Sequence, residues 1–210
     1  MTETAETRRI LCWRHGQTAW NAEKRFQGQT DIPLNERGLA QAERAAGLLA
    51  RLRPDAIVSS DLSRAATTAG FLARATGLRV ELDKGLRERF GGRWEGLTTP
   101  EIRERWPEEN ARMEIPDGED ILAVGERVQE AVLRALPRVP EGGLLVVVGH
   151  GAALRAGINR MIGLPPEIRQ ALGPIGNCAW SVLGPHGGGW RLLEHNATSL
   201  PETHPLSDDR

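Results

Sequence analysis

The sequence feature that most constrains the fold is a pair of short apolar runs, each ending at a turn that contains a histidine. Residues 10–13 lead into an Arg-His-Gly turn with His15, and residues 144–148 lead into a Gly-His-Gly turn with His150. Short apolar runs bounded by glycine are typical of buried strands. Because the carboxyl ends of parallel strands border the ligand crevice of open α/β sheets, we expect both histidines at one crevice.

The rest of the chain alternates further short strands with helical periodicity, which is typical of an α/β domain. Its 210 residues suit a single domain over 1–210, with an ordered core of about 9–196 between polar tails. We expect helices over 36–52 (with Leu39 on its buried face), from caps at Ser60 and Asp61 to Gly77, from Pro100 to a stop at Trp106-Pro107, over 119–136 and over 152–162. We expect further strands at 55–59 and 79–82, and a terminal hairpin of 178–183 and 190–193 whose turn, 184–189, holds His186. His186, His195 and His204 are expected to be exposed bystanders.

The composition argues against several classes of partner. The formal net charge is −1, from 27 basic and 28 acidic residues, so no overall field attracts nucleic acid or an anionic membrane. The polar N-terminus lacks the apolar segment of a signal peptide, and Cys12 and Cys178 lack a metal-binding or redox spacing. No Rossmann or Walker glycine pattern is present. These features predict a cytoplasmic protein without a cofactor, a nucleic-acid partner or a membrane partner.

The Arg14-His15 pair suggests phosphoryl transfer. A neutral imidazole is a nucleophile, and a guanidinium beside it binds phosphoryl oxygens and disfavours protonation of the histidine. Arg64 is expected in the first turn of a helix, where unpaired amides and the helix dipole favour phosphate. The alternative is that Arg14 and His15 merely close a strand and that Arg64 is a solvated helix residue.

Five blocks of sequence, in the same order, resemble the histidine phosphatase superfamily, which includes the cofactor-dependent phosphoglycerate mutases. They are Arg-His-Gly-Gln-Thr-Ala-Trp-Asn at 14–21 with the segment 25–34, Ser-Ser-Asp-Leu-Ser-Arg-Ala at 59–65, Leu-Arg-Glu at 86–88, Trp-Glu-Gly at 94–96 and Val-Gly-His-Gly at 148–151. Because they span most of the chain, we favour the functional interpretation of the arginine and histidine residues. The resemblance implies a phosphoglycerate mutase-like fold: α/β, a three-layer α/β/α sandwich with a mostly parallel central sheet.

The resemblance also implies roles for the matching residues. His15 would attack phosphorus and become a transient phosphohistidine, while three cationic or donor groups would surround the phosphoryl oxygens: Arg14, Arg64 and His150. Glu88 would protonate the departing alkoxide and then activate water. By comparison with the family, Glu95 in its Trp-Glu-Gly context would have a structural role. Neutral substrate-binding groups would come from Asn21, Gln27, Gly28 and Gly151. With these groups around the phosphate, we expect no metal ion at the site.

The implied function is a metal-independent phosphatase for a small phosphate ester. Within the superfamily, four segments are similar to the actinobacterial glucosyl-3-phosphoglycerate phosphatases: residues 59–65, 176–180, 190–192 and 196–197. One hypothesis is that an arginine of the loop, Arg87, Arg89 or Arg93, meets a substrate carboxylate; the alternative is a solvated basic loop. The sequence does not determine the oligomeric state, and a homodimer is one of the states that it allows.

Two other functions remain as alternatives. A phosphoglycerate mutase is disfavoured because only 62 residues separate Glu88 from His150, and because residues 27–29 read Gln-Gly-Gln where mutases tend to show Thr-Gly-Trp. A non-catalytic phosphate-binding module is disfavoured because the five central residues of the family's pocket are all present.

Overall fold

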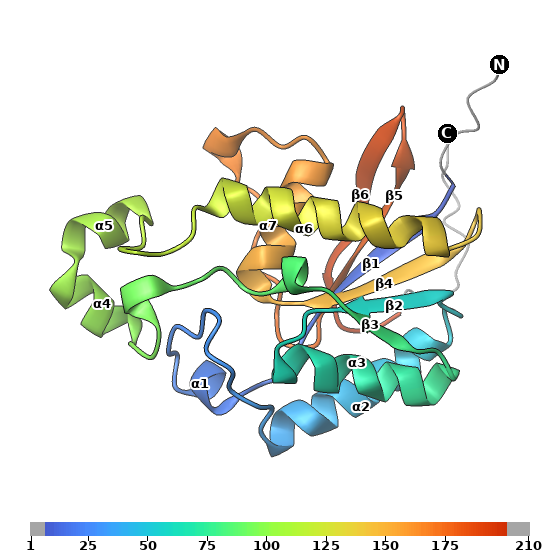
Figure 1. Cartoon of the computed structure of the whole chain (residues 1–210), viewed down its shortest axis with the longest axis horizontal. Coiled ribbons are helices and arrows are strands. Elements are labelled where there is room, and N and C mark those ends of the chain that lie inside the picture. The colour runs from blue at the N-terminus through green and yellow to red at the C-terminus, as the bar shows by residue number, and fades with distance from the viewer. Residues whose placement is uncertain (1–6, 201–210) are drawn as a thin grey trace.

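The computed structural model describes residues 7–200, which fold around one six-stranded sheet (Figure 1). The strand order is β3-β2-β4-β1-β5-β6. The pairs among β3, β2, β4 and β1 are parallel, whereas β5 runs antiparallel to both β1 and β6, so the predicted mostly parallel sheet is confirmed. The strands are β1 (Arg9–Arg14), β2 (Ala56–Ser59), β3 (Val80–Leu82), β4 (Leu144–Gly149), β5 (Trp180–His186) and β6 (Gly189–Ala197).

Helices cover both faces of this sheet, which confirms the predicted three-layer α/β/α sandwich. One face carries α2 (Glu36–Ala50) and α3 (Ser63–Thr76), and the other carries α6 (Ile121–Ala135) and α7 (Gly151–Met161). The remaining elements are short: α1 (Ala19–Ala22), α4 (Thr99–Arg105), α5 (Pro107–Arg112), and the 3₁₀ turns η1 (Lys84–Leu86), η2 (Gly92–Trp94), η3 (Leu136–Arg138) and η4 (Pro166–Ile168).

The strand side chains alternate between two cores. Ile10 and Cys12 pack with residues of α6 and α7, while Leu11 and Trp13 pack with residues of α2 and α3. All six residues of β4 are buried in the same alternating way. A strand covered on both faces needs apolar side chains at every position, which explains the two uninterrupted apolar runs.

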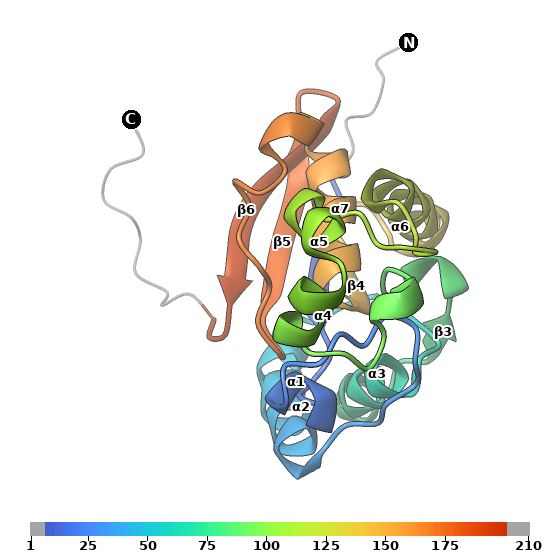
Figure 2. The same ribbon diagram turned by 90° about the vertical axis from the view of Figure 1, so that its left-hand side faces the viewer.

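A third and smaller core lies at one end of the sheet, where α4 and α5 project (left in Figure 1; facing the viewer in Figure 2). It consists of Trp94, Ile102 and Ile115, against which Phe26 and Trp106 pack. The expected stop at Trp106-Pro107 is confirmed, since α4 ends at Arg105 with Trp106 as its C-cap. A second helix that the sequence did not predict, α5, then begins at Pro107, because a proline at the first helical position lacks only an amide that would be unpaired anyway.

The start of α3 also differs from the expectation. The helix begins at Ser63 with Leu62 as its N-cap, and no side chain caps it. The expected caps have other partners: the Ser60 hydroxyl lies 2.9 Å from Nε2 of His150, and the Asp61 carboxylate pairs with the Arg87 guanidinium. Leu39, expected on the buried face of α2, is 39% exposed.

The terminal hairpin is longer than expected. Its turn contracts to Gly187 and Gly188, both with positive φ, which is the backbone shape that a two-residue hairpin turn requires. His186 is exposed, as expected, but His195 is not a bystander, since its ring bonds the Ser181 hydroxyl and the Gly173 carbonyl. His204 lies outside the described residues.

Three neighbouring strands end at the same level, and this arrangement positions the site. The residue after β1, His15, donates its amide to the carbonyl of Gly149 at the end of β4 (3.0 Å). The residue after β2, Ser60, donates its amide to Val148 in the same way (2.9 Å). The expectation that both histidine turns lie side by side is therefore confirmed.

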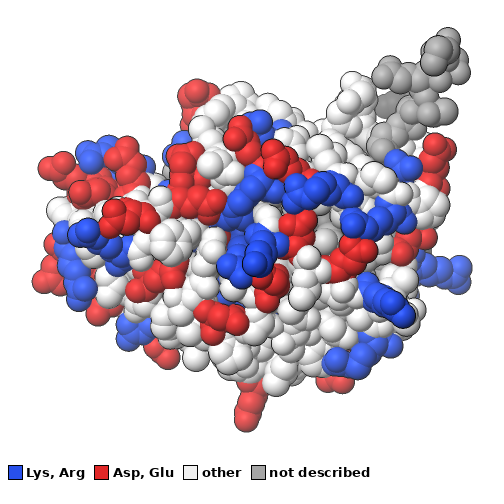
Figure 3. All heavy atoms as spheres, in the orientation of Figure 1, with Lys and Arg blue, Asp and Glu red and all other residues white. Residues whose placement is uncertain are grey.

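The surface carries mixed charge. Figure 3 shows Lys and Arg interspersed with Asp and Glu over the face in view, in keeping with a net charge near zero. No helix within residues 7–200 is long and apolar enough to cross a membrane.

Candidate active site

The backbone around His15 fixes the orientation and the tautomer of its ring. The side chain is buried, and its Nδ1 lies 2.6 Å from the carbonyl oxygen of Gly16. A carbonyl can only accept, so Nδ1 carries the ring proton and the lone pair is left on Nε2. His15 therefore presents an unprotonated Nε2 at the strand ends.

Burial and nearby positive charge keep the two site histidines neutral. Burial, followed by the charges of Arg14 and Arg64, holds the pKa of His15 well below its usual value of 6.5. The pKa of His150 is lowered in the same direction, by burial and then by Arg64. The two rings meet edge to face, with centroids 5.1 Å apart. The imidazole at this site is thus a free base at neutral pH.

These shifts predict a pH-dependent stability. The unfolded chain binds protons at both positions below about pH 6.5, whereas the folded chain does not, so the free energy of unfolding must fall as the pH drops. We expect a loss approaching about 1.4 kcal/mol per pH unit for each histidine below about pH 6.5, measured by urea denaturation. His15→Asn should remove about half of this slope. A stability that stays flat down to about pH 5.5 would contradict the assigned neutral forms.

Arg64 and His150 position each other. The Arg64 Nε–H donates to Nδ1 of His150 (3.2 Å), so the other ring nitrogen carries the proton and donates to the Ser60 hydroxyl. The two terminal nitrogens of Arg64 donate to the carbonyls of Gly28 and Thr30, each at 2.8 Å. The guanidinium is fully buried. Two of its five N–H groups have no protein partner within residues 7–200 and remain for a ligand.

Arg14 provides the clearest sign of an anion-binding position. One terminal nitrogen donates to the Ile175 carbonyl at 2.7 Å, but its Nε is buried and has no hydrogen-bond partner. Beside it lies Gly151, where a Cβ would come within 3.3 Å of the guanidinium. An unpaired, buried cationic donor is costly unless a ligand accepts from it. The site therefore favours an anion at the Arg14 Nε.

Glu88 is held at the amino end of α7. Its carboxylate accepts from the amides of Ala152 and Ala153, at 3.1 and 2.9 Å. Burial lowers the pKa values of Arg14 and Arg64, and the negative charge of Glu88 opposes both shifts. One carboxylate thus lies near both guanidinium groups.

The predicted neutral residues border the same region. The Thr18 hydroxyl donates to the side-chain carbonyl of Gln27 (2.9 Å), and the Thr18 amide donates to that of Asn21 (3.1 Å). Within residues 7–200, the side-chain NH₂ groups of Asn21 and Gln27 have no partner. Asn177, for which sequence reasoning assigned no role, bonds both Asn21 and the His15 carbonyl (3.1 Å each).

Glu95 holds the loop that carries Arg64's partners. Its carboxylate accepts from the amides of Gln29 and Gly91 and from the amide and hydroxyl of Thr30. Gly28 has positive φ, and any Cβ there would overlap this carboxylate. These bonds fit the interpretation of Glu95 as structural, and the loop that it supports presents the Gly28 and Thr30 carbonyls to the Arg64 guanidinium.

The three loop arginines are engaged elsewhere. Arg87 forms a two-pronged pair with Asp61 at 2.6 and 2.7 Å, and Arg93 pairs with Asp117. Arg89 donates to the carbonyls of Met113 and Glu119. This engagement weighs against the hypothesis that one of them meets a substrate carboxylate. Among the residues described, no group of three or more His, Cys, Asp or Glu could hold a metal ion.

Comparison with known proteins identifies relatives along nearly the whole chain. The family model for the histidine phosphatase superfamily (branch 1) matches residues 10–198. The glucosyl-3-phosphoglycerate phosphatase of Mycobacterium tuberculosis is 37% identical over 91% of this chain and 96% of the relative. A probable phosphoglycerate mutase of Escherichia fergusonii is 37% identical over 80% of each chain. The solved mycobacterial glucosyl-3-phosphoglycerate phosphatase complexed with VO3 has a TM-score of 0.85 at 39% identity, covering 90% of this chain and 99% of that one.

Proposed function

The chain belongs to branch 1 of the histidine phosphatase superfamily and is a phosphatase, and we propose that it hydrolyses glucosyl-3-phosphoglycerate or a closely similar phosphoglycerate ester. The observation that carries the proposed chemistry is the convergence of a free-base His15 Nε2 with the unpaired, buried Nε of Arg14. One is a nucleophile and the other an anion donor, which together suit a phosphoryl group.

In the proposed first step, His15 Nε2 attacks phosphorus and forms an N–P bond. The ester P–O bond breaks, and the departing alkoxide takes the proton of the Glu88 carboxylic acid. Arg14 and the two remaining N–H groups of Arg64 donate to the phosphoryl oxygens, with neutral donors from Asn21, Gln27 and the amides at Gly28 and Gly151. His150 acts by holding Arg64.

In the second step, water attacks the phosphohistidine. Glu88, now a carboxylate, accepts a proton from this water while the N–P bond breaks and the electron pair returns to Nε2. Phosphate leaves, and the net reaction is hydrolysis of one phosphate ester. Every charge that develops faces an arginine or an amide, so the proposed cycle uses no metal ion.

The proposed substrate and cellular compartment are supported by observations outside the phosphate site. The relatives named for glucosyl-3-phosphoglycerate favour that ester, and a phosphoglycerate mutase is the second candidate because a relative of equal identity carries that name. A reducing compartment such as the cytoplasm is supported by the two buried, unpaired cysteines Cys12 and Cys178.

We expect ³¹P NMR of the EDTA-treated protein to show free phosphate released from both 3-phosphoglycerate and glucosyl-3-phosphoglycerate. Release should be faster from the glucosyl ester by roughly tenfold or more, the discrimination that one further set of substrate contacts gives. Heat-inactivated protein serves as the control. Growth of a 2-phosphoglycerate signal in place of phosphate would instead establish a mutase.

A further inference from the structure

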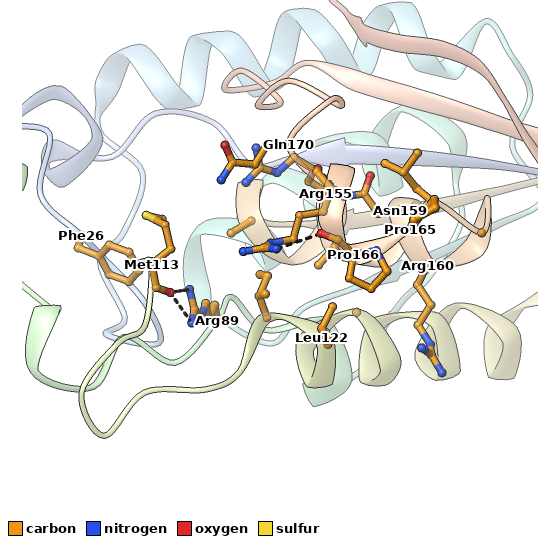
Figure 4. Close-up of a pocket in the computed structure, with 17 residues that line it drawn as sticks. Phe26, Arg89, Met113, Leu122, Arg155, Asn159, Arg160, Pro165, Pro166 and Gln170 are labelled. Atoms are coloured by element: carbon orange, nitrogen blue, oxygen red, sulfur yellow. Dashed lines mark hydrogen bonds between the residues drawn. The ribbon is translucent and has the colours of Figure 1, made fainter. Parts of the chain in front are cut away.

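A cavity of ≈ 340 Å³ opens beside the phosphate site. Its walls come from α6, from α7, from the segment 163–170 and from three side chains outside these elements, Phe26, Arg89 and Met113 (Figure 4). It borders the phosphate site through Ala152, whose amide donates to Glu88. A molecule bound through its phosphate at His15 would therefore have this cavity as a neighbouring space for its leaving group.

One face of α7 connects the two regions. Ala152, Arg155, Ala156 and Asn159 line the cavity at the spacing of a single helix face. Their helix starts directly after His150. At 1.5 Å per residue, Arg155 lies about 7.5 Å and Asn159 about 13.5 Å along the axis from that histidine. This face of α7 thus presents Arg155 to the part of the cavity nearer the phosphate site and Asn159 to the part farther away.

Arg155 is a cation without a partner. The half-buried side chain has no hydrogen bond or ion pair within residues 7–200. Arg160, at the same cavity, is instead paired with Glu126 at 3.0 Å and with Gln129. No Asp or Glu lines the cavity. A planar guanidinium without a counter-ion in such a place suits a carboxylate.

Asn159 has one buried polar atom without a hydrogen-bond partner. It is only 8% exposed, and its NH₂ donates to the carbonyl of Arg169 at 2.9 Å, which fixes the orientation of the amide. Its Oδ1 is buried and accepts from nothing. A buried acceptor of this kind needs a hydrogen-bond donor. A ligand hydroxyl could supply it, and one molecule can carry both a hydroxyl and a carboxylate.

We propose that this cavity is the leaving-group subsite and that it takes a carboxylated, hydroxyl-bearing compound, with Arg155 binding the carboxylate and Asn159 Oδ1 accepting from a hydroxyl. Apolar walls that include Leu122 and Leu164 cover the carbon skeleton. The inference rests on the proposed phosphatase function and deepens it, since it assigns recognition of the carboxylate to one face of α7. Arg89, the loop arginine that also lines the cavity, is already bonded to the carbonyls of Met113 and Glu119.

The test compares Arg155→Met, which keeps the apolar stem, with Arg160→Met. The second variant is the control, because Arg160 is already paired with Glu126. The substrates are 3-phosphoglycerate, which carries a carboxylate, and p-nitrophenyl phosphate, which does not. For Arg155→Met, the kcat/KM ratio of the first to the second should fall by roughly 10- to 100-fold, mostly through KM, as expected for a lost charged hydrogen bond. For Arg160→Met the ratio should stay near that of the wild type.

Asn159→Ala extends the test to the hydroxyl. It should lower kcat/KM for glucosyl-3-phosphoglycerate relative to 3-phosphoglycerate by roughly 2- to 10-fold, the range of a neutral hydrogen bond. An Arg155→Met ratio equal to that of Arg160→Met would overturn the subsite while leaving the phosphatase intact. A wild type that cleaves p-nitrophenyl phosphate but neither carboxylated ester would overturn the proposed substrate as well, so the two failures are distinguishable.

Discussion

His15→Ala is expected to abolish phosphatase turnover, with a loss of about 10⁵- to 10⁶-fold in kcat, comparable to the loss of the nucleophile in other covalent catalysts. No other described side chain replaces it, because the second histidine of the site has one ring nitrogen accepting from Arg64 and the other donating to Ser60. Nothing then remains to form the N–P bond. Steady-state release of phosphate from 3-phosphoglycerate measures the loss.

The covalent intermediate gives a second readout. A ³²P-labelled substrate, quenched into alkali, should leave label on the wild-type chain and none on His15→Ala, because the phosphohistidine bond survives base but not acid. His186→Ala is the matched control, since that histidine is exposed at the end of β5 and its ring bonds Arg191, away from the strand ends that carry the site. Label that persists in His15→Ala, or turnover above about one per cent of wild type, would contradict the assignment.

The parts of this site that follow local rules could be predicted from sequence. Two apolar runs could only be strands buried on both faces, and parallel strands align their ends, so the meeting of His15 and His150 followed. The position of Arg64 in the first turn of α3 followed from the strand before it and from Gly77 at the end of the helix. Each of these inferences starts from a pattern within a single strand or helix.

The parts that sequence could not supply depend on long-range partners. Glu95 reaches Thr30 across 65 residues, and Arg87 finds Asp61 across 26. A guanidinium can bind a substrate or an acidic neighbour equally well. The sequence therefore could not distinguish the loop arginines from Arg155, because only the structure shows which arginines have hydrogen-bond or ion-pair partners. The sequence did not single out Asn159 either, because only the folded cavity shows that its Oδ1 has no hydrogen-bond partner.

Glu88→Gln is expected to lower kcat for 3-phosphoglycerate by about 10²- to 10⁴-fold, the usual contribution of general acid–base catalysis. The amide cannot give a proton to an alkoxide or take one from water. It keeps an oxygen that can accept from Ala152 or Ala153, so the packing at the start of α7 should survive, and thermal unfolding checks this. Inorganic phosphate should still bind, because Arg14 and Arg64 are unchanged.

The leaving group separates this role from a structural one. p-Nitrophenolate departs without a proton, so Glu88→Gln should slow formation of the phosphohistidine from p-nitrophenyl phosphate far less than from 3-phosphoglycerate. Rapid-quench measurement of the first turnover compares the two esters directly. Breakdown of the intermediate by water is common to both and should be slowed equally. Equal loss for both esters in the first step would mean that Glu88 only holds the end of α7, and the proton donor would have to be sought elsewhere in the site.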